Sequence, residues 1–280
     1  MTLVGSEALV VAQINAADVP VVLDSGATFG LVSYGEAARL HLNWHSVRGH
    51  PALGGVGGTA STLLAFAFAN VRLGAARAAD ARFVVSNLPA GPAAAIIGRN
   101  ILDFYDLDYD LRARLIELMR PHGCERVPPI YWRSSHPYSA ADFDRIGNSP
   151  TVLGYIDGVA TRIMFDTGAS TTVLDIRAAA RAGVKEGMPG TVAGGRVLGV
   201  AGHAVQTWVV PISSVRIGDE EIRNTRLRIG ELALAQTDMV LGTDFFLSHH
   251  VYVANGQQKV YFTYEGGPVF DVNRARGNDK

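Results

Sequence analysis

The chain has little of the chemistry that cysteine provides. It is 280 residues long and contains one cysteine, Cys124. A disulfide framework or a zinc site of several thiolates needs more than one cysteine, so both are excluded within this sequence. No local signature of a reactive thiol surrounds Cys124, and we interpret it as an ordinary unpaired residue.

An excess of charge of either sign is also missing. Lys and Arg number 25, Asp and Glu number 26, and the formal net charge is −1. The basic residues are dispersed among acidic ones, so no basic face predicts a nucleic-acid partner. Because 48% of the residues are hydrophobic and only 18% are charged, we expect a globular chain.

Long hydrophobic runs are absent. The apolar stretches are interrupted by Gly, Arg or Asp and are too short to cross a bilayer, so we expect no membrane span. Residues 1–7 lack the basic and hydrophobic regions of a signal peptide. Patterned sequence begins almost at once, which is compatible with a leader removed from a longer precursor; the sequence leaves this open.

Several common enzyme motifs are missing as well. There is no Gly-x-Ser-x-Gly elbow, Walker loop or Gly-x-Gly-x-x-Gly fingerprint, so neither a serine hydrolase nor a nucleotide-binding enzyme is favoured. His41 and His45 have helical spacing but no Glu between them, and we expect no metal site. We interpret His249 and His250 as marking a strand edge. We expect no cofactor.

What the chain does contain is an internal repeat. The segment ALVVAQINAADVPVVLDSGAT at 8–28 aligns without a gap with PTVLGYIDGVATRIMFDTGAS at 150–170. In each segment two apolar runs surround a turn, Asn15-Ala16 or Asp157-Gly158, and an Asp-Ser/Thr-Gly-Ala string follows. A turn of this kind between apolar runs predicts a β-hairpin.

The repeat continues beyond the hairpin with an Ala-rich segment that predicts a short helix, a glycine-rich turn and an alternating strand. These features cover 34–42, 54–58 and 62–73 in the first half, and 175–184, 199–202 and 205–217 in the second. Each half then reaches two aliphatic residues and a glycine. The separation between Asp24 and Gly98 is nearly the same as that between Asp166 and Gly242.

These patterns predict an all-β chain of two similar β-barrel lobes related by a pseudo-two-fold axis, with few short helices. We expect the first lobe at 1–120 and the second at 149–266. Residues 121–148 contain prolines and show little periodicity, so we interpret them as a linker. Asn255-Gly256 predicts a further hairpin, and we expect 267–280 to be a loose polar tail.

The two Asp-Ser/Thr-Gly triplets predict acid–base chemistry by a pair of carboxyl groups. A single triplet is usually a turn, but here each follows an apolar strand, which brings Asp24 and Asp166 to the edge of a buried region. Two neighbouring carboxylates in an apolar cleft share one proton, because they cannot both ionise. The ionised carboxylate can activate a water, and the protonated one can hydrogen-bond a carbonyl.

Six further residues are expected to support the two aspartates. Hydroxyls can bond across the junction between the lobes, and glycines allow backbone to approach the carboxylates or to pass behind them. The supporting residues are Ser25, Gly26, Gly98, Thr167, Gly168 and Gly242.

Two pairs of strings carry a resemblance to a known family. They are Asp24-Ser25-Gly26-Ala27 with Ile96-Ile97-Gly98-Arg99-Asn100-Ile101-Leu102, and Asp166-Thr167-Gly168-Ala169 with Val240-Leu241-Gly242-Thr243-Asp244. The chain resembles retropepsin-type aspartic proteases, with two copies of the retroviral unit in one polypeptide. The second half is also similar to bacterial aspartyl-protease-family chains. The resemblance covers roughly residues 8–118 and 150–264.

The resemblance implies an aspartic endopeptidase that cleaves extended, partly apolar polypeptide and works as a monomer with an intramolecular dyad. It implies no cofactor, and a periplasmic or secreted location after leader removal. Glycine-rich turns would be flaps, and side chains beside the dyad would form subsites. The flap positions are Gly55, Val56, Gly57, Gly58, Val200, Ala201 and Gly202, and the subsite positions are Val22, Ile96, Met164 and Val240.

The repeat alignment also shows where the two halves differ in the expected cleft. Asp238 stands in place of Ala94, and Thr243 in place of Arg99. Asp238 is either a carboxylate beside a subsite, favouring a basic or polar substrate residue, or a solvated loop residue. Both triplets are followed by Ala, which offers no hydroxyl to the dyad, so we predict a mildly acidic optimum of about pH 4 to 6.

The alternative function is a non-catalytic peptide-binding or scaffold module with the same fold. Paired carboxylates that repel each other have no use in a cleft that only binds. Carboxylates within hydrogen-bonding reach of each other would therefore favour the enzyme.

Overall fold

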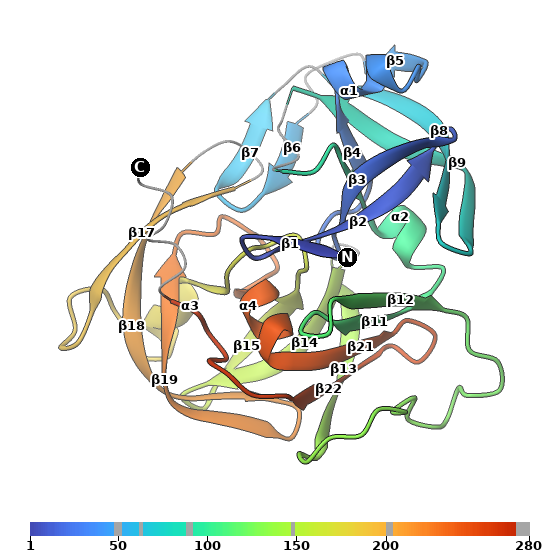
Figure 1. The fold of residues 1–280 in the computed structure, drawn as a ribbon. Helices are drawn as coiled ribbons and strands as arrows, with labels where there is room; N and C mark the ends of the chain where they lie inside the picture. The colour runs from blue at the N-terminus through green and yellow to red at the C-terminus, as the bar shows by residue number, and fades with distance from the viewer. Residues whose placement is uncertain (48–51, 62–63, 88–91, 147–148, 200–203, 273–280) are drawn as a thin grey trace.

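The chain forms two β lobes joined by a shared sheet (Figure 1). The computed structural model describes residues 1–47, 52–61, 64–87, 92–146, 149–199 and 204–272. Strand makes up 54% of it and helix 9%. The predicted all-β class is confirmed.

Six strands of the first lobe close into a barrel. Their order is β2-β3-β10-β4-β9-β8, and pairing of β2 with β8 completes the ring. Two short strands, β1 (Thr2–Val4) and β5 (Trp44–Ser46), extend the sheet beyond the ring. The barrel strands are β2 (Glu7–Ile14), β3 (Ala17–Leu23), β4 (Gly30–Ser33), β8 (Ala65–Leu73), β9 (Ala76–Ser86) and β10 (Ala95–Ile97).

The second lobe repeats this ring strand by strand. Its order is β14-β15-β20-β16-β19-β18, closed by pairing of β14 with β18. The parallel pairs β3–β10 and β4–β9 recur as β15–β20 and β16–β19. The strands are β14 (Ser149–Ile156), β15 (Val159–Phe165), β16 (Val173–Asp175), β18 (Ala204–Ile217), β19 (Glu220–Gly230) and β20 (Met239–Leu241), with β17 (Val192–Leu198) at the edge.

The two repeat hairpins form at the predicted turns. Asp157 and Gly158 have φ of 46° and 80°, and Asn15 and Ala16 have φ of 47° and 68°. All four residues therefore occupy the left-handed region. Gly158 adopts it freely, whereas the Cβ of Ala16 makes it costly, by about 1 kcal/mol.

Five more strands extend the second sheet. They are β11 (Asp106–Asp110), β12 (Leu115–Met119), β13 (Tyr138–Ile146), β21 (His249–Ala254) and β22 (Lys259–Tyr264), in the order β12-β11-β21-β22-β13 leading into β14. The predicted hairpin at Asn255-Gly256 joins β21 to β22. The linker prediction is wrong for β13, and β11 and β12 join the second sheet although they fall within the range expected for the first lobe.

The helices are short. α1 (Tyr34–Arg39) and α3 (Ile176–Arg181) lie inside the predicted segments, and Ser33 and Asp175 cap them by accepting backbone N–H groups. α2 (Arg99–Leu102) and α4 (Thr243–Ser248) were not predicted, and each begins directly after the glycine of an aliphatic-aliphatic-Gly string.

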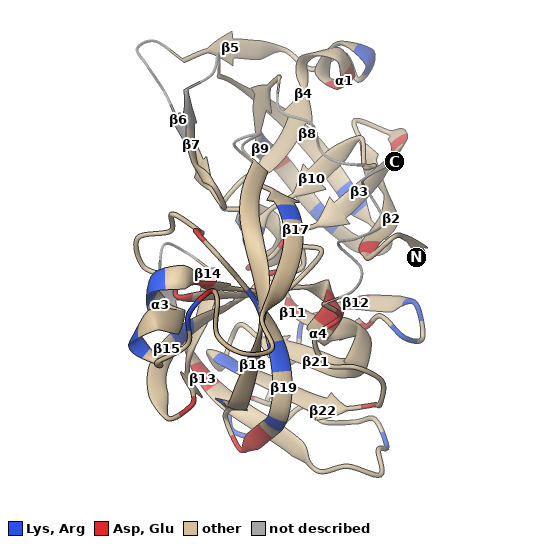
Figure 2. Cartoon of the chain, turned by 90° about the vertical axis from the view of Figure 1, so that its left-hand side faces the viewer, with Lys and Arg blue, Asp and Glu red and all other residues tan. Residues whose placement is uncertain are grey.

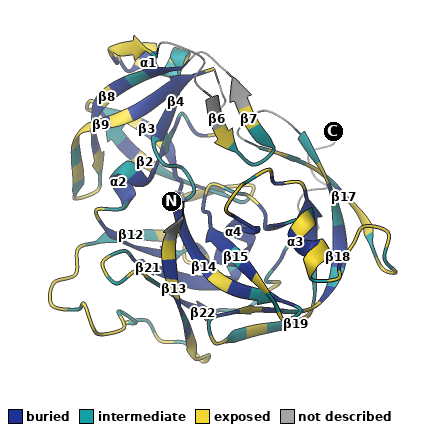
Figure 3. Ribbon diagram, turned by 180° about the vertical axis from the view of Figure 1, so that it is seen from behind, coloured by how far each residue is buried: buried dark blue, intermediate teal, exposed yellow. Residues whose placement is uncertain are grey.

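One hydrophobic core runs through both lobes, with exposed residues concentrated in outer turns (Figure 3). Phe270 belongs to this core, so the expectation of a loose tail is wrong as far as residue 272; residues 273–280 lie outside the described part. His249 and His250 begin β21 and are buried, stacked on Phe245 and Trp132.

Charged residues of both signs are interspersed over the two lobes (Figure 2). Among the described residues, no helix is long and apolar enough to span a membrane.

Candidate active site

Asp24 and Asp166 occupy equivalent places where a barrel strand ends. Asp24 follows β3 and its N–H donates to the carbonyl of Ile97 in β10, at 2.9 Å. Asp166 follows β15 and its N–H donates to the carbonyl of Leu241 in β20, also at 2.9 Å. Both aspartates are buried, with 8% and 9% of their surface exposed. The parallel strand pairs thus fix the backbone of both aspartates in the same way.

The loop after each aspartate orients its carboxylate. The N–H groups of Gly26 and Ala27 donate to Asp24 Oδ1 at 2.8 and 2.9 Å. The N–H of Gly168 donates to Asp166 Oδ1 at 2.9 Å. One oxygen of each carboxylate is therefore held by its own loop, which leaves the other oxygen for chemistry.

Ser25 and Thr167 join the two loops reciprocally. The Ser25 N–H donates to Thr167 Oγ1 at 3.1 Å, and the Thr167 N–H donates to Ser25 Oγ at 3.0 Å. Each hydroxyl then donates to a carbonyl of the opposite lobe: Ser25 to Phe165 at 2.8 Å and Thr167 to Leu23 at 2.6 Å. This set of four hydrogen bonds fixes the lateral position of one aspartate relative to the other.

The glycines of the triplets lie against the opposite carboxylates. A Cβ on Gly26 would come within 2.6 Å of the Asp166 carboxylate, and a Cβ on Gly168 within 2.3 Å of Asp24 Cγ. Any side chain at these positions would push the carboxylates apart. Glycine is required there because each loop packs directly on the other lobe's aspartate.

Gly98 and Gly242 lie behind the dyad loops. A Cβ on Gly98 would meet the Phe29 backbone at 2.5 Å, and one on Gly242 would meet the Thr171 backbone at 2.6 Å. The chain after each triplet passes over these glycines, which the sequence predicted.

The two carboxyl groups lie close enough to influence each other's ionisation. Burial raises the pKa of both, and the negative charge of Asp24 raises the pKa of Asp166 further. Backbone donors from Ala27 and Gly26 partly offset the rise at Asp24. Two neighbouring carboxyl groups whose pKa values are both raised favour a single proton shared between them.

A cavity of about 570 Å³ opens beside the dyad. Its walls are mostly apolar, and they include Gly55, Val56, Ile96 and Met164 among the expected flap and subsite positions. The remaining lining residues are Asp24, Gly26, Ala27, Thr28, Phe29, Leu31, Gly54, Val84, Ser149, Asp166, Leu234, Ala235, Gln236 and Thr237.

Other expected positions do not line this cavity. Val22 and Val240 are buried beneath the surface of the cleft, with 4% and 1% exposed. The flap positions Val200, Ala201 and Gly202 lie outside the described residues. Sequence reasoning missed the wall formed by 234–237, since no motif marks that loop.

The first flap is a hairpin of β6 (Ala52–Gly55) and β7 (Gly58–Ser61). Val56 and Gly57 form its tip. The Gly57 N–H donates to the Leu232 carbonyl of the second lobe at 3.0 Å, and Gly199 lies against the Val56 carbonyl so closely that a Cβ there would clash. The tip of this hairpin therefore lines the cavity and contacts the opposite lobe.

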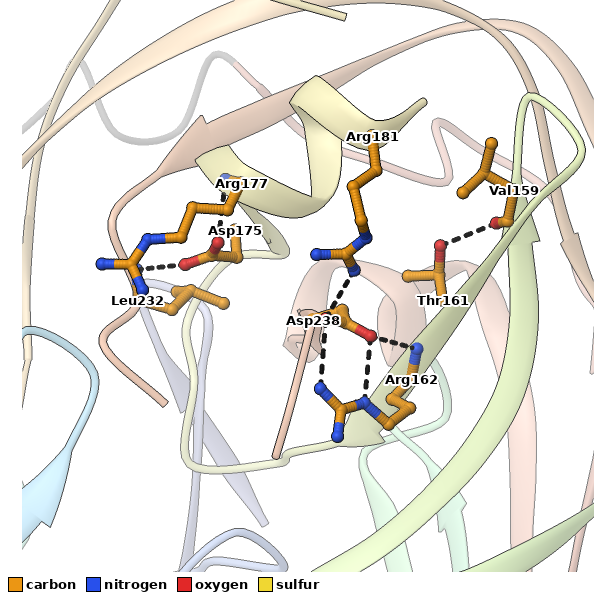
Figure 4. Close-up of polar contacts among 8 residues, drawn as sticks. All are labelled: Val159, Thr161, Arg162, Asp175, Arg177, Arg181, Leu232 and Asp238. Carbon is orange, nitrogen blue, oxygen red and sulfur yellow. Dashed lines mark hydrogen bonds and ion pairs between the residues drawn. The ribbon is translucent and has the colours of Figure 1, made fainter. Parts of the chain in front are cut away.

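Asp238 has a role other than those expected from the sequence. It is buried, at 7% exposed, and it forms ion pairs with Arg162 at 3.1 Å and Arg181 at 2.8 Å (Figure 4). Burial raises its pKa, but the hydrogen bonds from the two arginines outweigh burial and the net pKa is lowered. Asp238 is thus neither a solvated loop carboxylate nor a cavity residue.

The other expected difference between the lobes also lies away from the cavity. Arg99 is buried and pairs with Asp103 at 2.8 Å, while Thr243 is buried and donates to the Ala169 carbonyl at 3.2 Å. Both side chains anchor loops. In the part of the chain that the structure describes, no group of three or more His, Cys, Asp or Glu could hold a metal ion.

Comparison with known proteins finds a family match in each half of the chain. Residues 10–101 match the family "Aspartyl protease", and residues 152–248 match the family "gag-polyprotein putative aspartyl protease". No curated protein matches the chain. One solved structure, EIAV protease complexed with the inhibitor HBY-793, is 24% identical over 34% of this chain and 83% of its own, with a TM-score of 0.28. The chain therefore belongs to the retropepsin-like aspartyl proteases, with one family unit in each half.

Proposed function

We propose that the protein is an aspartic endopeptidase whose dyad is Asp24 and Asp166. The observation that carries the proposal is the packing of each carboxylate on the opposite triplet's glycine, with the Ser25 and Thr167 hydrogen bonds crossing between the lobes. This arrangement brings two carboxylates together in a buried setting that raises the pKa of both. A protein that only binds peptide gains nothing from such a pair.

In the proposed reaction, ionised Asp24 accepts a proton from a water as the water oxygen adds to the scissile carbonyl carbon. Asp166 gives its proton to the carbonyl oxygen, which forms a tetrahedral diol. The proton on Asp24 then passes to the amide nitrogen, the C–N bond breaks, and a diol hydroxyl returns its proton to Asp166. Both carboxylates end in their starting states.

The cavity supports an extended substrate with an apolar side chain. Phe29, Leu31, Val84 and Ile96 form one wall, and Met164 lies on the other side of the dyad. The flap tip would cover a peptide bound there. Because both aspartates come from one chain, we propose that the active site needs no second copy.

The test is hydrolysis of a diverse peptide pool by the wild type and by Asp24→Asn and Asp166→Asn. Each substitution should lower kcat/KM by at least about a thousandfold, because the shared proton is lost. The melting temperature of each variant provides the control for folding. Substantial hydrolysis by a folded variant would exclude the mechanism, and specific activity that falls on dilution would exclude the intramolecular site.

A further inference from the structure

Each lobe carries a small apolar cluster that is separate from the main core. In the first lobe Leu31 pairs with Ile96, and in the second lobe Val173 pairs with Val240 in the equivalent antiparallel register. Each pair belongs to the small cluster of its own lobe. Because the dyad residues are equivalent in the two lobes, the clusters mark the places for the two substrate residues that flank the scissile bond.

The two clusters differ in their access to the cavity. Leu31 and Ile96 line the cavity, whereas Val173 and Val240 do not and are 3% and 1% exposed. Val56, at the tip of the first flap, packs against the second-lobe cluster that contains Val173 and Val240. Val56 is half-buried and also lines the cavity. A residue of the first lobe thus helps to cover the second-lobe cluster.

Backbone contacts hold the flap tip on the second lobe. The Gly57 N–H donates to the carbonyl of Leu232 at 3.0 Å, and Leu232 is a buried member of the same cluster. A Cβ on Gly199 would lie 1.6 Å from the Val56 carbonyl oxygen, so the backbones of the flap tip and of the second lobe are in close contact. The Val56 side chain is therefore held in space whose first-lobe equivalent belongs to the cavity.

We infer that Val56 is a specificity-determining residue, which takes the room for a large side chain on the second-lobe side of the dyad. The preferred substrate then carries a large apolar residue against the first-lobe wall and a small residue, such as alanine, on the other side of the scissile bond. A large residue there would have to displace Val56 and the Gly57 hydrogen bond. This inference rests on the proposed peptidase function and adds the sizes of two substrate residues.

The test begins with cleavage-site mapping on a diverse peptide pool, which identifies the side of the bond that carries the large apolar residue. Matched peptides are then made with alanine or leucine on the other side of the bond. The wild type should prefer alanine by about tenfold in kcat/KM, because excess volume in an apolar site has effects of this size. Val56→Ala should bring the ratio close to one, and Val56→Leu should raise it.

Val11→Ala is the matched control, because Val11 is 67% exposed on β2 and does not line the cavity; its ratio should equal that of the wild type. Val84→Ala, in the first-lobe wall, should change the preference for the large residue and leave the alanine preference in place.

If Val56 only supported the fold of the flap, Val56→Ala would lower kcat/KM for both peptides alike, and the unchanged ratio would overturn the inference. Equal cleavage of both peptides by the wild type, or a cleavage map without a large apolar residue on either side of the bond, would overturn it as well. Cleavage of no peptide at all would instead overturn the proposed function itself.

Discussion

In the first lobe, Leu31 on β4 pairs with Val84 on β9, and both residues line the cavity. In the second lobe the corresponding pair is Val173 and Arg228. Arg228 is 1% exposed and its guanidinium donates to the carbonyls of Gly194 and Val272 and to Thr207 Oγ1. One strand position thus serves as a cavity wall in one lobe and as a buried anchor in the other.

The loops that follow Asp24 and Asp166 have kept the same contacts in both lobes. Ser25 and Thr167 make equivalent hydrogen bonds, and Gly26 and Gly168 make equivalent close approaches. The proposed chemistry needs both carboxylates in one geometry, so under it the loops that hold them cannot change independently. A wall touches only its own part of a substrate, which leaves it free to change in each lobe.

The largest expected effect comes from adding a side chain to the glycine of either triplet, and it tests whether both loops require glycine equally. Gly26→Ala and Gly168→Ala each place a Cβ within 2.6 Å or less of the opposite carboxylate. Each should lower kcat/KM at least about a hundredfold, because displacement of a reacting group by about 1 Å has effects of this size. Gly256→Ala is the control, since no atom lies within 4 Å of its Cβ. Near-normal activity in either loop variant would contradict the close packing.

A second prediction concerns Asp238, whose counterpart in the first lobe is an alanine. Asp238→Asn should lower the free energy of unfolding by about 1–3 kcal/mol at pH 7, because charge-assisted hydrogen bonds to Arg162 and Arg181 are lost. The folded-state pKa lies below the unfolded value of 3.8. The stabilisation is therefore present above that pH and is lost as the pH falls through the folded-state pKa.

Urea unfolding of wild type and Asp238→Asn from pH 2 to pH 7 measures this difference. Asp18→Asn, at an exposed position on β3, is the control and should leave stability nearly unchanged. Cleavage sites should be the same in wild type and Asp238→Asn, since Asp238 does not line the cavity. A changed preference for the substrate residue at one subsite would instead support the subsite role that the sequence suggested for Asp238.

The smallest effect concerns the two hairpin turns. Ala16→Gly gives the first turn the residue type that Gly158 gives the second. It should raise the free energy of unfolding by about 0.5–1 kcal/mol, because Ala16 has φ of 68° and glycine tolerates this conformation. Chemical denaturation measures the gain, and a loss of stability would mean that the Ala16 methyl group makes a contact that matters more than its backbone cost.

The sequence predicted the parts of the molecule that repeat. The two apolar hairpins, the short helices after them and the glycines behind the triplets all follow from local pattern, and the internal repeat doubled each signal. The likeness of the halves also predicted that Asp24 and Asp166 would be equivalent, and in the structure each follows a barrel strand and donates to the neighbouring parallel strand.

What the sequence could not predict depends on tertiary packing. The buried face of β13 consists of Ser139, Ala141 and Phe143, of which only Phe143 is large and apolar, so beside nearby prolines it does not read as an apolar alternation. The wall at 234–237 faces the cavity only because flanking strands and the Asp238 ion pairs hold the loop there.

The strands β11 and β12 are synthesised in the first half of the chain, but β11 pairs with a strand near the end of the second half. They follow the first repeat in the chain, yet β11 pairs with β21, so Leu107 lies opposite Val253. During synthesis the first barrel can close as soon as β10 has emerged and β11 can pair with β12, whereas the pairing of β11 with β21 must wait for nearly the whole remaining chain. The last strands of the first half therefore dock onto the second sheet only after the strands of both barrels have been synthesised.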